Sequence, residues 1–309
     1  MNHLSFYWLQ PDKNKLIEAL KSDFCKLVEQ SILSNNIVLP PIPDVVIKIQ
    51  QLSTNESATI KEVAETLLAD PGLTANVIRV SNSAVFNRSN ITCNSAITAV
   101  SRLGIYRVRD LVTAQAIEEL KNSTNLNAEC NELLKKSAHS SRDFAAVMTL
   151  LCQCMAKHKE EEDSFYLEPE KALLTGLLAD IGIFCLISEF YEYQKSGNYL
   201  DFDIATQIFN SRCSYVSKIV LTLWGFDQDF INVATNKVNG HKQDGDSISY
   251  LDIARMANHL LMFRNKDKCI DEHEVEITAL GAEALYELSN LSDSDFNNRI
   301  QDVIKQSGL

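Results

Sequence analysis

The sequence predicts an all-α fold, a multi-helix bundle of about a dozen helices. Apolar residues recur at helical spacing along almost the whole chain of 309 residues. Glycine and proline, which interrupt helices, number only 10 and 6. No segment makes a convincing strand, so we expect helices packed on helices around one core.

Capping residues and breakers place the helices of the first half. The prolines at 40, 41 and 43 halt the chain in an extended conformation after an N-terminal helix. Thr59-Ile-Lys-Glu62 then forms a capping box. Asp70-Pro71 supplies the N-cap and first position of the following helix. Two further helices are expected, one capped by Asn94 or Ser95 and stopped at Gly104, the other over about 106–121.

The second half contains the longest helix and the most apolar one. A long helix should run from Ala128 to about His158, followed by an acidic surface loop over 159–163. The stretch Ala172–Ile187 is too short to span a bilayer comfortably, and Asp180 interrupts it. We therefore interpret it as a helix buried in a soluble core, with no membrane insertion.

The net charge and the cysteines indicate the cellular compartment and the kinds of partner that we expect. The net charge of −12 and the pI near 5.0 repel phosphate backbones, so we expect no nucleic-acid partner. The N-terminus lacks the basic start and apolar run of a signal peptide. None of the eight cysteines forms a CxxC pair, which favours reduced, mostly buried thiols in a cytoplasmic protein.

Several motifs in order carry a family resemblance. The first half contains Leu39-Pro-Pro-Ile-Pro43, Asp70-Pro-Gly-Leu-Thr74, Arg79-Val-Ser-Asn-Ser-Ala84 and the run from Ile97 to Arg109. The second half contains Ser137-Ala-His-Ser140, Thr175-Gly-Leu-Leu-Ala-Asp-Ile-Gly182, Phe209 to Cys213 and Leu223-Trp-Gly225. In order and spacing, these pieces resemble an HDOD domain over roughly residues 33–263.

HDOD domains resemble the HD superfamily of metal-dependent phosphohydrolases, and they are generally regarded as non-catalytic modules of bacterial signalling. The resemblance implies an all-α fold of HD type, a cytoplasmic bacterial setting and a regulatory role. It divides the chain into an N-terminal helical extension at 1–32, the HDOD-like domain at 33–263 and C-terminal helices at 264–309 that pack on it.

The positions that would hold a metal ion in that superfamily are mostly replaced. His139 stands where the resemblance places the first histidine, but the paired His-Asp motif reads Ala179-Asp180. Cys213 replaces another expected histidine. The later His-His pair falls at Lys237-Val238, although His241 lies close by. Because a metal site needs three or four well-aimed ligands, we expect no metal, no other cofactor and no catalytic residue.

The remnant formed by His139, Asp180 and Cys213 has two interpretations. A zinc site made of these three side chains is conceivable. We favour a structural role, in which His139 and Asp180 pair between two core helices, because a buried unpaired carboxylate is costly.

The segment around Arg79, Asn82 and Ser83 is a candidate interaction surface, although its small residues could instead allow close helix packing. We expect output through a signalling protein partner or a homodimer, because no further signalling domain is recognisable. The main alternative is a residual metal-dependent phosphohydrolase acting on a nucleotide or cyclic dinucleotide. A third is a small-molecule sensor that uses the vacated metal cavity.

Overall fold

The computed structural model describes residues 3–9, 12–34, 36–87, 91–123, 126–158, 167–237, 248–267, 270, 275 and 277–307. Within these ranges the regular elements are helices and none is a strand, so the predicted all-α fold is confirmed. In chain order they are η1 (Leu4–Phe6), α1 (Lys13–Lys21), α2 (Asp23–Leu33), α3 (Asp44–Ser53), α4 (Ile60–Leu67), α5 (Pro71–Ser81), α6 (Ala96–Leu103), α7 (Ile105–Ser123), α8 (Ala128–His158), α9 (Pro169–Leu178), α10 (Gly182–Lys195), α11 (Phe202–Leu223), α12 (Gln228–Thr235), α13 (Tyr250–Arg264), α14 (Ala279–Ser289) and α15 (Asp293–Ser307).

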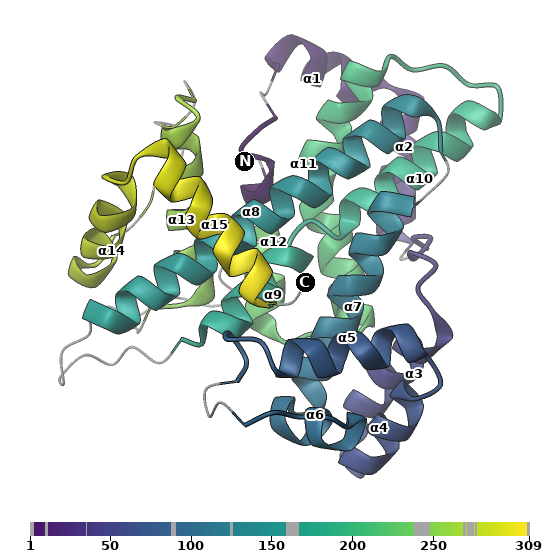
Figure 1. Ribbon diagram of the computed structural model, residues 1–309. Coiled ribbons are helices and arrows are strands. Elements are labelled where there is room, and N and C mark those ends of the chain that lie inside the picture. The colour runs from purple at the N-terminus through teal and green to yellow at the C-terminus, as the bar shows by residue number, and fades with distance from the viewer. Residues whose placement is uncertain are drawn as a thin grey trace.

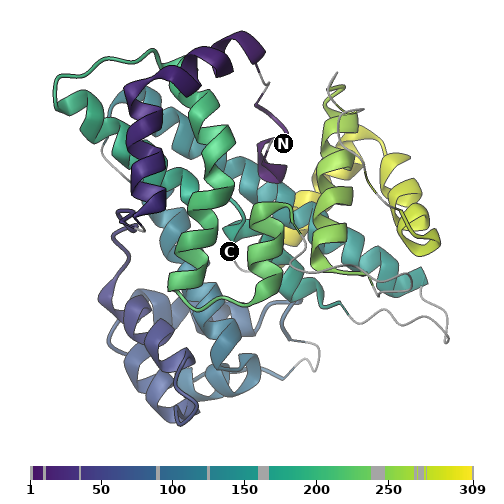
Figure 2. The ribbon, with the colours of Figure 1, turned by 180° about the vertical axis from the view of Figure 1, so that it is seen from behind.

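The 31-residue helix α8 is the axis of the molecule. It packs against α7, α9, α10, α13, α14, α15 and η1. Helices α3 to α6 form a layer of their own at one end of the molecule, and α7 runs from this layer into the centre (Figure 1). The view from behind shows α1, α2, α10 and α11 together at the opposite end (Figure 2).

The predicted capping residues begin the helices as expected. Thr59 and Glu62 form the reciprocal hydrogen bonds of a capping box at the start of α4. Asp70 accepts a hydrogen bond from the Leu73 amide, and proline follows at the first turn of α5. Of the two possible caps of α6, the structure uses Ser95, whose hydroxyl accepts from the Thr98 amide. Local sequence therefore determines several of these boundaries.

The apolar stretch that we interpreted as one buried helix is two helices. α9 ends at Leu178, and α10 begins at Gly182 after a turn that contains Asp180. By length and composition the combined stretch Pro169–Lys195 could cross a membrane. Its most apolar 18-residue window has a mean hydropathy of 1.8, but 89% of that window is buried inside the protein. This burial matches the core position predicted for it.

Two glycines bring these helices into close contact with their neighbours. A Cβ atom on Gly176 would lie 2.6 Å from the Ala145 Cα of α8, and one on Gly182 would lie 2.6 Å from the Ser217 nitrogen of α11. Only a residue without a side chain allows this approach. The turn between α9 and α10 is thereby held between α8 and α11.

The segments outside the predicted domain pack on it at both ends. Three phenylalanines link α2 to α10 and α11: Phe24 and Phe190 meet edge to face with ring centroids 5.2 Å apart, and Phe190 and Phe209 are 5.6 Å apart. At the other end of the chain, α14 and α15 both contact α8. The domain boundaries themselves stay a prediction.

Candidate functional site

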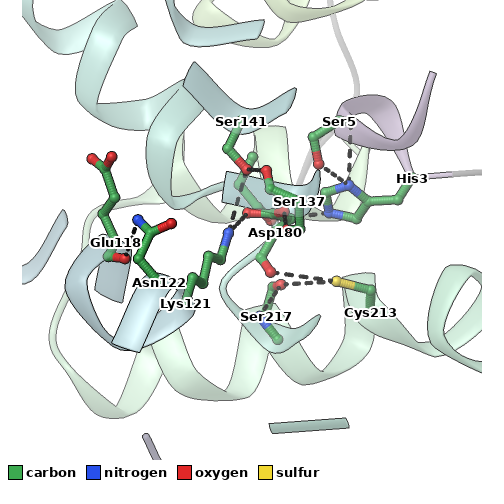
Figure 3. A network of polar contacts seen from close by, with 12 residues as sticks. His3, Ser5, Glu118, Lys121, Asn122, Ser137, Ser141, Asp180, Cys213 and Ser217 are labelled. Carbon is green, nitrogen blue, oxygen red and sulfur yellow. Dashed lines mark hydrogen bonds and ion pairs between the residues drawn. The ribbon is translucent and has the colours of Figure 1, made fainter. Parts of the chain in front are cut away.

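The turn between α9 and α10 carries a buried ion pair. The Asp180 side chain is 1% exposed, and its Oδ1 lies 2.8 Å from the Nζ of Lys121, whose side chain is 2% exposed. The second carboxylate oxygen, Oδ2, accepts a hydrogen bond from the Ser137 hydroxyl of α8. Figure 3 shows these groups converging from α7, α8 and the α9–α10 turn. Each carboxylate oxygen thus has a donor.

Lys121 closes the site from the side of α7. Its Nζ also lies 3.3 Å from the hydroxyl of Ser141, which in turn donates to the carbonyl of Ser137 at 2.7 Å. Beside Lys121 there is a pocket of only 10 Å³, bordered by Ile117, Glu118 and Leu177. That volume is enough for about one water molecule, because one water needs about 10–15 Å³.

The charges of this pair explain how the carboxylate is held ionised. Burial alone raises the pKa of Asp180, but the Lys121 ammonium and the hydrogen bonds from Lys121 and Ser137 together outweigh it and lower that pKa. The ammonium therefore compensates a charge that would otherwise be costly in the core.

The N-terminal segment adds a histidine next to this pair. His3 is 2% exposed, and its Nε2 lies 2.9 Å from the carbonyl oxygen of Ala179. Burial lowers the pKa of His3 to about 4. The Asp180 carboxylate acts in the opposite direction and raises this pKa, whereas the Lys121 ammonium lowers it further. The ring is therefore neutral near pH 7 and donates to the residue that precedes Asp180.

Cys213 lies beside Asp180, as the sequence predicted, but as a buried thiol. Its Sγ is 3.8 Å from the Asp180 carbonyl oxygen and 3.7 Å from the Ser217 hydroxyl. Burial raises the pKa of the thiol, so it stays protonated at neutral pH. A protonated buried thiol is not a nucleophile.

The prediction that His139 pairs with Asp180 is wrong. The His139 side chain is 69% exposed, and its Nε2 lies 3.4 Å from Oδ2 of Asp143 one turn further along α8. Ser137 faces Asp180 instead, and a residue two positions further along a helix points about 200° away. The resemblance placed the histidine on the correct helix but did not reveal which face it occupies.

Lys237, at the expected position of the His-His pair, is not the lysine that contacts Asp180. Lys237 lies at the surface with its Nζ 5.6 Å from the centroid of the Tyr215 ring, and Lys121 is the lysine at Asp180. Val238 and His241 lie outside the described residues.

Three residues of the site were missed by sequence reasoning: His3, Lys121 and Ser137. The sequence did predict that Asp180 needs a partner, but it gave no signal for which one. The helix over about 106–121 was expected to end near Lys121, whereas α7 continues to Ser123 and Lys121 is buried. His3 lies 177 positions from Asp180 in the sequence, so only tertiary structure brings the two together.

The residues of the site do not fit a divalent metal ion. Asp180 already engages a lysine and a serine, His3 bonds to a backbone carbonyl, and His139 is elsewhere. Among the described residues, no group of three or more His, Cys, Asp or Glu side chains is placed to hold a metal. A lysine ammonium next to the remaining carboxylate opposes cation binding further.

The segment proposed as an interaction surface makes internal hydrogen bonds. The side-chain Nδ2 of Asn82 donates to the backbone carbonyl of Cys93 at 2.7 Å. Its Oδ1 accepts a hydrogen bond from the backbone N–H of Cys93, also at 2.7 Å. Arg79 donates to Asn76, and the Ser83 hydroxyl donates to the carbonyl of Val80 at 2.8 Å. Asn82 thus fastens the chain before α6 to the end of α5, and the role of this segment in partner binding stays a prediction.

Comparison with known proteins identifies the family. The model of the HDOD domain matches residues 39–239, well over half of the chain, so this protein belongs to the HDOD domain family. The predicted family membership is confirmed. None of the curated proteins matches the sequence.

Solved structures share the fold at low identity. A protein named "putative metal-dependent phosphohydrolase" from Shewanella amazonensis SB2B aligns with a TM-score of 0.65 and 20% identity, over 92% of this chain and 96% of that one. An HDOD domain protein with unknown function from Geobacter sulfurreducens aligns with a TM-score of 0.48 and 17% identity, over 91% and 97%. The MmoQ response regulator from Methylococcus capsulatus str. Bath aligns with a TM-score of 0.33 and 21% identity, over 83% and 95%. The first likeness supports a fold of HD type and says nothing of activity.

Proposed function

We propose that this protein is a non-enzymatic regulatory protein of bacterial signal transduction that acts in the cytoplasm by binding a signalling protein. Membership of the HDOD family supports the signalling role. The observation that carries the proposal is the buried pair of Lys121 and Asp180. The resemblance puts Asp180 among the residues that would hold a metal ion in a hydrolase of HD type, and the pair supports the proposal because this carboxylate already has a cation.

The pair argues against hydrolysis for two physical reasons. The remaining carboxylate already has a cation, so a metal ion would have to displace a buried ammonium and leave it uncompensated. The pocket beside Lys121 has a volume of 10 Å³, far too small for a phosphate ester. The same volume argues against a small-molecule sensor at this position, because ligand pockets have volumes of about 300 Å³ or more.

A residual phosphohydrolase acting on a nucleotide or cyclic dinucleotide is the alternative, and retention of Asp180 is the observation that favours it. Metal content of the purified chain, and its turnover of bis(p-nitrophenyl) phosphate and of a cyclic dinucleotide with added Mn²⁺, separate the two functions. The Asp180→Asn variant is the matched control. We expect less than stoichiometric metal and no turnover above the control. Stoichiometric metal, with turnover that the control loses, would establish the alternative.

The partner itself requires a positive experiment. Because His3 is buried, an affinity tag belongs at the C-terminus and not at the N-terminus. We expect the tagged chain, purified from its own cells, to retain a signalling protein in stoichiometric amount. Light scattering of the purified chain then distinguishes a homodimer from a monomer. A monomer that retains no partner under any growth condition would contradict the proposal.

A further inference from the structure

The N-terminal segment, residues 3–9, reaches the Asp180 cluster from outside the region matched by the family. That region begins at residue 39. The segment contains the three-residue helix η1, which contacts α8 and α13. In both ribbon views it lies in the middle of the molecule, apart from α1 and α2, which continue toward one end (Figures 1 and 2). The chain therefore covers this site with its own terminus.

His3 anchors the segment through four hydrogen bonds, three of which involve its ring and fix its tautomer. Its Nδ1 accepts from the Ser5 hydroxyl at 2.7 Å and lies 3.3 Å from the Ser5 amide nitrogen, a backbone donor. The ring proton must then be on Nε2, which donates to the Ala179 carbonyl at 2.9 Å. The His3 amide donates to Oδ1 of Asn210 on α11 at 3.3 Å. This one residue thus joins the α9–α10 turn to α11.

Aromatic contacts hold the rest of the segment. Phe6 is 2% exposed, and its ring lies edge to face with Trp8 at a centroid distance of 5.8 Å. The Nζ of Lys136, on α8, lies 4.5 Å from the Trp8 ring centroid. These contacts bury apolar surface, so the segment is docked and not merely adjacent.

Two costs within the same segment oppose this docking. The indole Nε1 of Trp8 is buried and has no hydrogen-bond partner among the described residues. The His3 ring gives up the solvation it would have in water, and a protonated ring could not keep the bonds from Ser5 to Nδ1. The segment also has only one short 3-10 helix to hold its backbone. A segment with so few backbone bonds and such costs opens more easily than a central helix such as α8.

From this balance we propose that residues 3–9 are a releasable latch, which closes the Asp180 cluster when docked and can leave while the helices stay folded. When docked, the latch fastens α8, the α9–α10 turn and α11 to one another. Its release would expose the backbone carbonyl of Ala179, the side-chain amide of Asn210 and the apolar surface that the Phe6 ring covers. A binding partner that takes up or displaces this segment would change the site without unfolding the bundle.

Tryptophan fluorescence can follow the latch directly, because the chain has only two tryptophans. The Trp224→Phe variant leaves Trp8 as the sole reporter. Urea unfolding is then followed by Trp8 emission and by far-UV circular dichroism. We expect the Trp8 emission to shift to the red at a lower urea concentration than the loss of helix. Adding His3→Ala should lower the Trp8 midpoint further and leave the helical midpoint unchanged.

Leu33→Ala is the control, since its side chain is 86% exposed at the end of α2, outside the latch. It should move neither midpoint. Hydrogen–deuterium exchange of the unmodified chain provides a second measurement that needs no substitution, and we expect residues 3–9 to exchange at least tenfold faster than the middle of α8. The latch would be overturned if the Trp8 and helical midpoints coincide both in Trp224→Phe and in the variant that also carries His3→Ala. Equal exchange rates of residues 3–9 and α8 would overturn it as well. Both readouts report attachment and not turnover, so they are independent of the proposed function.

Discussion

Replacing Lys121 with methionine tests the buried pair, because methionine keeps much of the side-chain length and loses the charge. The Asp180 carboxylate, 1% exposed, would keep Ser137 as a donor but lose its only ion-pair partner among the described residues. Removing one partner of a buried pair costs about 3–5 kcal/mol, because the other charge is left uncompensated. For a chain of 309 residues, a loss of about 4 kcal/mol corresponds to a melting temperature lower by roughly 6 °C.

The pH dependence of this loss has a definite sign. In the unmodified protein the pKa of Asp180 is lowered, so its contribution to stability is present above the unfolded pKa of about 3.9 and is lost as pH falls below it. Without Lys121, burial prevails and raises the pKa. The folded variant then binds a proton more readily than the unfolded chain does. The loss in free energy of unfolding that Lys121→Met causes should therefore be larger at pH 8 than at pH 5.

Urea unfolding followed by circular dichroism at both pH values measures the deficit, together with a double-mutant cycle. Lys121→Met and Asp180→Asn each remove one charge, and the double variant removes both. We expect the double variant to be more stable than the sum of the single losses predicts, by about 2 kcal/mol. Additive losses, or a Lys121→Met deficit below about 1 kcal/mol at both pH values, would refute the reasoning.

Three further predictions concern groups around this pair. Ser137→Ala removes a hydrogen bond to a buried carboxylate and should cost about 1.5–3 kcal/mol in urea unfolding. The pKa of His3 is lowered from an ordinary 6.5 to about 4, so the unfolded chain binds that proton first. The free energy of unfolding should therefore fall by up to about 3 kcal/mol as pH drops from 6.5 toward 4. In His3→Gln, urea unfolding at several pH values should no longer show this part of the pH dependence. Gly176→Ala places a Cβ 2.6 Å from the backbone of α8 and should cost about 1–3 kcal/mol in thermal unfolding, whereas Gly72→Ala, with its nearest atom at 3.3 Å, should cost much less.

Much of the fold could be predicted because it is encoded locally. The helical periodicity of the sequence predicted a helix from Ala128 to about His158, and α8 spans Ala128–His158. The break between α9 and α10 was missed, because residues 172–187 form one apolar run whose interruption is a turn of only a few residues. Periodicity gives little information about so short a turn within a hydrophobic segment.

The site was less predictable because its contacts are tertiary. A buried aspartate requires a partner, and that requirement could be read from the sequence. The identity of the partner depends on how far α7 extends and on which face of α8 meets the turn. His139 was chosen by motif position, whereas Ser137 has the correct helical face. His3 belongs to a segment without any family motif, so no local signal connects it to Asp180.

The central proposal is that the Lys121 ammonium, and not a metal ion, neutralises the Asp180 carboxylate. A crystal structure determined from crystals grown with Mn²⁺, with anomalous differences measured for manganese, tests this claim most directly. We expect Lys121 Nζ about 2.8 Å from Asp180 Oδ1, with no anomalous peak at the carboxylate. Lys121 turned away, with manganese bound to Asp180, would contradict it.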